Sequence, residues 1–141
     1  MSIDAALYSF NSEALFQCLV EAQRRGIQVR LLTDWNKYEQ SELTRKLLMD
    51  ACFAHKLSRG RDGSNSKMHH KFLILDQAIV VTGSYNWTLA SEIQHFENIV
   101  VLREPDSIRN YRSEFNTLWD AGLTPPGVGI KGLRRLSGLE I

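Results

Sequence analysis

Hydrophobic residues recur along the chain with two periods, one typical of strands and one of helices. Residues 3–10 read as a strand, after which Asn11 and Ser12 supply the N-cap chemistry of a helix. We expect Gly26 to end that helix and the alternation over 27–34 to form the next strand. This β-α-β unit predicts a parallel pair of strands with a right-handed crossover. The apolar positions of the helix are Ala14, Leu15, Cys18, Leu19 and Ala22.

The middle of the chain predicts a second helix, a loop and a pair of strands. Helical spacing over 39–54 places Leu43, Leu47, Leu48 and Cys52 on one side. The polar segment 58–67, rich in glycine and serine, indicates a loop. We expect strands at 69–76 and 79–82, joined by a tight connection at Gln77 and Ala78.

The last third of the chain adds a turn, one strand and one helix. Residues 83–88 form the turn, which leads into a short helical piece, and 97–102 form the strand. Asp106 is expected to cap the final helix, which ends before Gly122. The whole pattern predicts an α/β fold with a mixed, mostly parallel sheet and helices on both faces. We expect one catalytic domain over 1–122, followed at 123–141 by a basic tail or peripheral helix.

Composition narrows the class of protein. The 141 residues include 17 Lys plus Arg and 16 Asp plus Glu, a formal charge of +1, so binding to a polyanion by bulk attraction is excluded. Cys18 and Cys52 fall inside apolar helical patterns, which favours core positions and a reducing compartment. No stretch is apolar enough to cross a membrane, and the start lacks the pattern of a signal peptide. We therefore expect a cytoplasmic protein.

Positive charge gathers in one segment despite the balanced total. Residues 55–71 carry five lysines and arginines against Asp62 alone, a local charge of +4. Such runs are usually solvated surface, but this one leads directly into the chemistry described next. We expect Arg59, Arg61 and Lys67 to contact the backbone of an anionic substrate.

A set of polar residues around the two central strands predicts a phosphate site. His69 and Lys71 are two positions apart on a strand, so they point to the same face, and Asp76 ends that strand. The returning strand delivers Ser84 and Asn86 near the same rim, after Gly83, which permits a close backbone approach. Lysine neutralises phosphate charge while hydroxyl and amide groups donate to its oxygens. The imidazole is left as nucleophile or acid-base group.

These residues resemble the HKD signature of the phospholipase D superfamily. The match runs without a gap from His69 through Lys71, Asp76 and Gly83 to Ser84 and Asn86. Glu97 and Asn98, followed by an apolar strand, are similar to the small, single-motif members of the family, and the segment QRRGIQVRLLTD resembles their passage from helix to strand.

The resemblance implies a metal-independent mechanism without a cofactor. His69 would attack phosphorus to form a phosphohistidine, and Lys71, Ser84 and Asn86 would bind the phosphoryl oxygens. Asp76 would support the geometry of the motif, and Glu97 would hold the second ring nitrogen of the histidine. The family's active site uses two motifs and this chain has one, so we expect a homodimer with a shared site.

Several residues admit a plainer interpretation beside a functional one. His70 points away from His69 and reads as a partly buried histidine with a backbone partner. His95 is either a surface residue or part of the cleft, and a zinc site using these histidines lacks the usual ligand spacing. Asp34, with Trp35, ends a parallel strand, where it serves either a turn or a ligand. Tyr85 is either core or a residue that stacks on the substrate.

Three enzymatic functions and one non-enzymatic function are compatible with these residues. A phosphodiesterase that cleaves nucleic acid, DNA or RNA, fits the basic segment best. A phospholipase or cardiolipin-type hydrolase would use the same chemistry on a lipid. A tyrosyl-DNA phosphodiesterase fits less well, because those relatives depart from the motif at Asp76. A silent nucleic-acid-binding module would not need an intact nucleophile.

Overall fold

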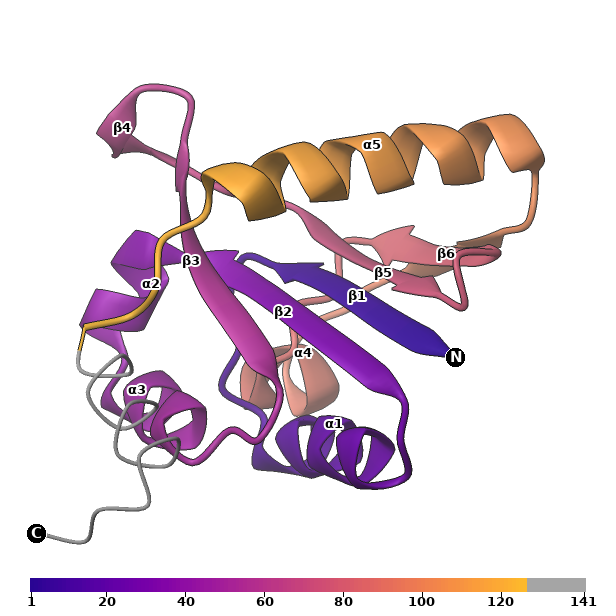
Figure 1. Ribbon diagram of the computed structural model, residues 1–141. Helices are drawn as coiled ribbons and strands as arrows, with labels where there is room; N and C mark the ends of the chain where they lie inside the picture. The colour runs from indigo at the N-terminus through magenta and orange to yellow at the C-terminus, as the bar shows by residue number, and fades with distance from the viewer. Residues whose placement is uncertain (127–141) are drawn as a thin grey trace, which may run out of the picture.

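The computed structural model describes residues 1–126 and builds them around one seven-stranded sheet (Figure 1). The strands are β1 (Ser2–Leu7), β2 (Gln28–Asp34), β3 (Ala54–Gly60), β4 (Gly63–Lys67), β5 (Lys71–Leu75), β6 (Ile79–Gly83) and β7 (Ile99–Leu102). The helices are α1 (Glu13–Arg24), α2 (Trp35–Gln40), α3 (Glu42–Met49), α4 (Leu89–Ile93) and α5 (Pro105–Ala121). Helix α5 crosses one face of the sheet, and α1 and α3 lie against the other, so the α/β class with helices on both faces is confirmed.

The sheet is mixed, and its parallel character matches the expectation only in part. The strand order is β4-β3-β2-β1-β5-β6-β7. Strands β1 and β2, and β2 and β3, pair in parallel, as the β-α-β unit predicts. The other four pairings are antiparallel. Short hairpins join β3 to β4 and β5 to β6, and such a connection reverses the chain direction. The connection from β6 to β7 is longer and contains α4.

Alternation along the central strands fills two separate cores. Ala5 and Leu7 of β1 face the side of α1 and α3, where they pack with Phe10, Phe16 and other buried residues. Ala6 faces the other side, where Phe72 and Phe115 fill the space beneath α5. A strand with both faces buried is held in one register, because a slip by one residue would exchange the two cores. The ends of β1 and β5 are therefore fixed in position.

The expected helix over 39–54 is two short helices. Asp34 caps α2 by accepting from the backbone nitrogen of Lys37 at 3.0 Å. Ser41 has an extended backbone, which ends α2, and its hydroxyl accepts from Thr44 to begin α3. Such side-chain caps compete with helix continuation, and periodicity alone does not report them. The helix also ends too early to include Cys52.

Two further expectations are wrong. Both cysteines are exposed. Helix α1 buries Phe16, Leu19 and Val20 and leaves Cys18 on its outer side, and Cys52 lies beyond the end of α3. The segment 58–67 is a β-hairpin of β3 and β4 rather than a loop, and its turn lies between Gly60 and Gly63.

The final helix ends as predicted, although its start differs. Glu104 takes the N-cap position and Pro105 opens α5, so Asp106 lies inside the first turn. After Gly122 the chain returns to the sheet, where Leu57 and Leu123 exchange two backbone hydrogen bonds of 2.8 Å. The described fold thus continues past residue 122, and the expected basic tail falls, from residue 127, outside the described residues. No helix within residues 1–126 is long and apolar enough to cross a membrane.

Candidate active site

His69 and Lys71 meet where the chain enters β5. His69 precedes the strand by two positions, and the Lys71 ammonium donates to its carbonyl oxygen at 3.0 Å. The same Nζ lies 3.2 Å from Nδ1 of the His69 ring. An ammonium and an imidazole in contact form a pair that can bind and attack one phosphorus centre. The structure therefore brings together the first two residues of the predicted site.

Tyr8 forms the floor beneath this pair. It directly follows β1, is almost fully buried, and donates its backbone N–H to the carbonyl of His70 at 2.8 Å. Its ring lies 4.3 Å from the His69 ring, centroid to centroid, at an interplanar angle of 48°. The Lys71 ammonium stands 5.3 Å from the same centroid. Aromatic contact of this kind restricts the orientation of the imidazole.

The electrostatics keep the imidazole neutral. Desolvation, followed by the charges of Lys71 and Lys67, lowers the pKa of His69 below its ordinary 6.5, and Asp34 opposes this shift. A neutral ring is the nucleophilic form of histidine. Desolvation also lowers the pKa of Lys71, while the charge of Glu97 acts in the opposite direction.

Ser84 and Glu97 form a second pair at the same rim. The Ser84 hydroxyl donates to Oε2 of Glu97 and accepts from the backbone nitrogen of Asn98 at 3.1 Å. The second carboxylate oxygen of Glu97 accepts from Ser91 at 3.2 Å. Glu97 thus acts electrostatically on Lys71 and orients Ser84, whereas the resemblance implies a bond to the ring of His69. Both carboxylate oxygens are already engaged by hydroxyl groups of the same chain.

Asn86 and Tyr85 follow Ser84 in the turn. The side-chain oxygen of Asn86 is buried without a hydrogen-bond partner among the described residues, although a buried acceptor usually has one. Tyr85 is half-buried, and desolvation, Glu92 and Glu97 raise the pKa of its phenol above 10.0. The phenol therefore stays a neutral hydrogen-bonding group beside Glu97.

The three predicted basic residues lie on the β3–β4 hairpin but have different surroundings. Lys67 reaches the site, since its ammonium lies 5.7 Å from the Tyr8 ring. Arg59 pairs directly opposite Lys67 and places its guanidinium 4.6 Å from the centroid of Trp35. Arg61 is exposed at the hairpin turn. The hairpin therefore delivers one of the three predicted cations, Lys67, to the site.

Asp76 is not in the site. It follows β5 at the end opposite His69, in a left-handed conformation with φ of 53°, and accepts from the backbone nitrogen of Ser2 at 2.9 Å. Asp76 thus holds the start of the chain and contacts no reacting group. Asp76 ends the strand as expected, but β5 is extended, so its two ends lie far apart and Asp76 does not share the rim of His69.

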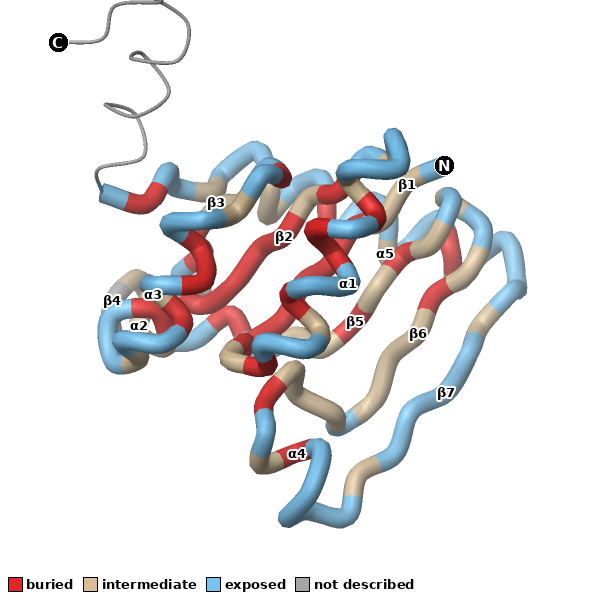
Figure 2. Tube along the Cα trace, turned by 90° about the horizontal axis from the view of Figure 1, so that it is seen from below, coloured by how far each residue is buried: buried red, intermediate tan, exposed pale blue. Residues whose placement is uncertain are grey.

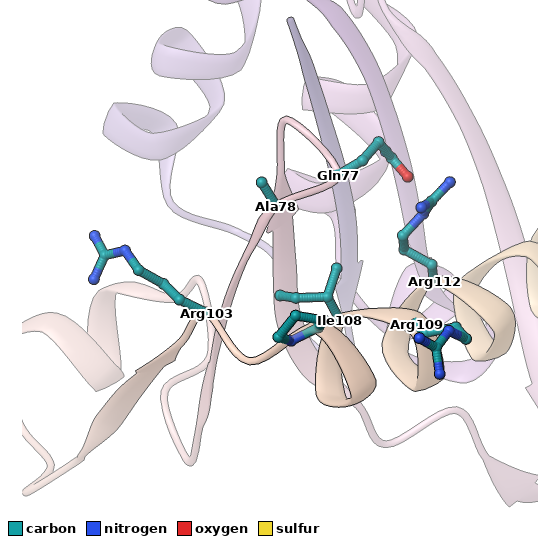
Figure 3. Close-up of a pocket in the computed structure, with 7 residues that line it drawn as sticks. Gln77, Ala78, Arg103, Ile108, Arg109 and Arg112 are labelled. Carbon is teal, nitrogen blue, oxygen red and sulfur yellow. The ribbon is translucent and has the colours of Figure 1, made fainter.

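A cavity of about 360 Å³ lies at this opposite end, between the β5–β6 turn and the start of α5. Figure 3 shows Arg112 reaching toward Gln77, while Arg103 and Arg109 extend in other directions. Arg109 is also paired with Asp106 at 2.9 Å. The cavity contains none of the predicted site residues.

The remaining candidates take structural positions. Asp34 is fully buried, and its Oδ1 accepts from the backbone nitrogen of Met68 at 2.9 Å, which ties β2 to the segment before His69. His70 points to the other face as expected, although its partner is the carboxylate of Glu114 at 3.1 Å rather than a backbone group. His95 is exposed. Among residues 1–126 no three His, Cys, Asp or Glu side chains gather into a possible metal site.

Sequence reasoning missed Tyr8 and Lys37. The Lys37 ammonium lies 5.3 Å from the Tyr8 centroid. A signal for both exists: Tyr8 follows β1 and Lys37 follows β2 by three residues. In α/β sheets the carboxyl ends of parallel strands are where ligands bind.

Comparison with known proteins shows the family of this chain. The family model described as the PLD-like domain of cardiolipin synthase matches residues 1–119. Mitochondrial cardiolipin hydrolases are similar, at 29% identity over 122 residues in Danio rerio and 30% over 119 in Xenopus laevis, covering 85% and 84% of this chain. This chain covers 52% and 55% of those two proteins, so it spans about half the length of the curated relatives it matches.

Two solved structures share the fold. NucT from Helicobacter pylori superimposes with a TM-score of 0.80 at 21% identity, over 88% of this chain and 82% of the other. Nuc from Salmonella typhimurium, a phospholipase D family member, gives 0.77 at 25% identity, over 86% and 80%. The His69–Lys71 pair, the Ser84–Glu97 pair and the family match over residues 1–119 lead to one assignment. This chain belongs to the phospholipase D superfamily of phosphodiesterases.

Proposed function

We propose that the protein is a metal-independent phosphodiesterase that cleaves nucleic acid through a phosphohistidine on His69. The observation that carries the proposal is the contact of His69 with Lys71 at the entry to β5, surrounded by further cations of the same chain. A polyanionic strand fits such surroundings, because each neutralised phosphate contributes to its affinity.

The chemistry divides one displacement into two. The neutral ring nitrogen of His69 attacks phosphorus, a P–N bond forms and the bond to the leaving oxygen breaks. That oxygen takes a proton from the histidine of a second copy, which then removes a proton from water. The water oxygen attacks the phosphohistidine and releases His69. Lys71 is placed to stabilise the negative charge on the phosphoryl oxygens throughout.

The chain exposes an apolar surface on which a second copy of the chain could dock. Segment 89–101, which comprises α4, the following loop and β7, exposes six large apolar side chains: Leu89, Ile93, Phe96, Ile99, Val100 and Val101. Figure 2 shows β7 as the open edge of the sheet, exposed along most of its length. Glu97, which bonds Ser84, lies among these residues. A copy docked on this apolar patch would therefore stand beside the phosphate site.

A cardiolipin-type lipid hydrolase is the second candidate. The observation in its favour is the identity of the curated relatives, several of which are named mitochondrial cardiolipin hydrolases. The same pair of residues would act on a lipid phosphodiester without any change of mechanism. The two functions differ only in what surrounds the scissile phosphate.

Cleavage assays separate the two functions. The purified protein is incubated in EDTA with single-stranded DNA, duplex DNA, RNA and cardiolipin vesicles, beside His69→Ala. We expect loss of at least one nucleic acid with the parent protein and none with the variant. Cleavage of cardiolipin alone would establish the second candidate. Survival of all four substrates over a range of pH would rule out both.

Light scattering tests the shared site. We expect a dimer at micromolar concentration, and Phe96→Glu with Val100→Glu should give a monomer with little activity, because two charges are placed in an apolar contact. The matched control is Leu43→Glu, an exposed apolar residue of α3 outside the apolar patch. An active monomer would contradict the shared site.

A further inference from the structure

We propose that Lys37 and Lys67, held on the ring of Tyr8, bind the phosphate next to the one that is cleaved. This inference rests on the proposed function and adds to it a second phosphate subsite. Lys37 comes from α2 and Lys67 from β4, so two elements separate in sequence deliver their ammonium groups to one aromatic ring.

The ring of Tyr8 gathers an unusual amount of positive charge. The ammonium groups of Lys37, Lys67 and Lys71 lie 5.3, 5.7 and 5.3 Å from its centroid. A cation within about 6 Å of an aromatic face is attracted by the negative face of the ring. The Lys71 ammonium also donates to the carbonyl oxygen of His69, whereas the ammonium groups of Lys37 and Lys67 form no salt bridge within residues 1–126. The ring therefore concentrates cations without neutralising them.

No carboxylate of the described chain forms an ion pair with this cluster. None of the ion pairs among residues 1–126 includes Lys37, Lys67 or Lys71. The nearby carboxylate of Asp34 is buried, and its two oxygens accept from the backbone nitrogens of Lys37 and Met68. Gathered like charges repel each other, so the arrangement costs folding free energy unless an anion occupies it.

The hairpin adds another repulsive pair at the same place. Arg59 and Lys67 face each other directly across β3 and β4. Like charges opposite each other in a ladder are destabilising. The Arg59 guanidinium stacks 4.6 Å from Trp35, the residue that begins α2. Two aromatic rings thus hold cations from the hairpin and from α2.

The three lysines have different roles, and these roles indicate two bound phosphates rather than one. Lys71 touches His69 and is therefore committed to the scissile phosphate. Lys37 makes no such contact, and Lys67 acts on His69 only through its charge. Each ammonium can donate three hydrogen bonds, more than one phosphate in contact with Lys71 and Ser84 requires. A neighbouring phosphate, one sugar along a strand, is the ligand that fits.

The test compares substrates with one and with several phosphates. Bis(p-nitrophenyl) phosphate carries a single phosphodiester, and a single-stranded oligothymidylate carries many. We expect Lys37→Ala to raise KM for the oligonucleotide about tenfold, with a much smaller increase on the single phosphodiester. Lys67→Ala should behave similarly, and Tyr8→Leu should reproduce the loss while Tyr8→Phe retains the aromatic face. Lys46→Ala, an exposed lysine of α3, is the charge-matched control.

A binding measurement tests the phosphate subsite independently of catalysis. In the His69→Ala background, fluorescence anisotropy of a labelled oligothymidylate should show weaker binding after Lys37→Ala, with the salt slope reduced by about 0.7. Equal losses on both substrates, or no loss of binding, would overturn the subsite. If the parent protein cleaves no oligonucleotide but still binds it in a way that depends on Lys37, the proposed function would be overturned and the subsite would stand. Dependence on Lys37 with cardiolipin vesicles but not with oligonucleotide would overturn the nucleic-acid assignment.

Discussion

The two ends of β5 both carry several cations, yet they differ in arrangement. At the His69 end, three ammonium groups converge on the Tyr8 ring and have no carboxylate partner among the described residues. At the Asp76 end, the arginines of the cavity spread in different directions, and Arg109 is already paired with Asp106 (Figure 3). Convergence of cations without ion pairs, rather than the number of basic residues, distinguishes a phosphate site from a basic surface.

The largest expected difference between the two ends is in catalysis. His69→Ala should lower kcat/KM by about 10³-fold or more, because it removes the nucleophile. Arg112→Ala, in the cavity at the other end, should change kcat/KM by less than about twofold. Both values are measured with bis(p-nitrophenyl) phosphate. A strong loss with Arg112→Ala would show that the two ends act together.

Glu97→Gln tests how the His69 end is organised. The change keeps the shape of the side chain but removes the charge that orients Ser84 and acts on Lys71. We expect kcat/KM to fall about 10²-fold. Because the charge of Glu97 raises the pKa of Lys71, the basic limb of the pH profile should also move to lower pH. Glu92→Gln, in the same segment, is the matched control and should leave that limb in place.

We expect substitutions of Asp34 and Asp76, which lie near opposite ends of β5, to differ in their effect on the free energy of unfolding. Asp34→Asn replaces one acceptor oxygen by an amide, so one of two buried backbone N–H groups loses its partner. We expect the free energy of unfolding in urea to fall by about 2 kcal/mol. Asp76→Asn should cost less, since Asp76 is exposed and asparagine tolerates its positive φ. Equal losses would contradict the structural role given to Asp34.

The smallest effect concerns the pH dependence. The charge of Lys67 lowers the pKa of His69, so the acid limb of kcat/KM should lie below pH 6.5 in the parent protein. Lys67→Ala removes this repulsion of the imidazolium, and the limb should move upward toward 6.5. Arg61→Ala removes a charge from the same hairpin and should not shift the limb. An unchanged limb in Lys67→Ala would place Lys67 farther from His69 than the structure does.

The sequence predicted the elements whose signals are local. Gly26, with φ of 86°, ends the first helix region as expected, and the β-α-β unit has the predicted parallel pairing. The spacing of His69 and Lys71 correctly places them together. The apolar periodicity over 39–54 predicted one helix, and the competing signal, the side-chain cap of Ser41, was missed. This cap divides the segment into two helices.

Long-range contacts account for the rest. Nothing near Tyr8 in the sequence reports that lysines from α2, β4 and β5 meet on its ring. The hairpin at 58–67 is polar and rich in glycine and serine, so it lacks the alternation by which strands are recognised. Asp76 ends its strand as expected but lies at the rim opposite His69, because a motif gives the order of residues along the chain and not their distance from one another in the fold.

Gly83 is required for close packing of two strands rather than for the reaction. A Cβ at this position would lie 2.1 Å from the carbonyl oxygen of Asn98 and 2.8 Å from the Cα of Ile99. Any larger residue would push β6 and β7 apart next to the Ser84–Glu97 pair. A saturation scan scored by activity would therefore rank position 83 beside the nucleophile, although it carries no reactive group. Intolerance to substitution and participation in the reaction are separate properties of this chain.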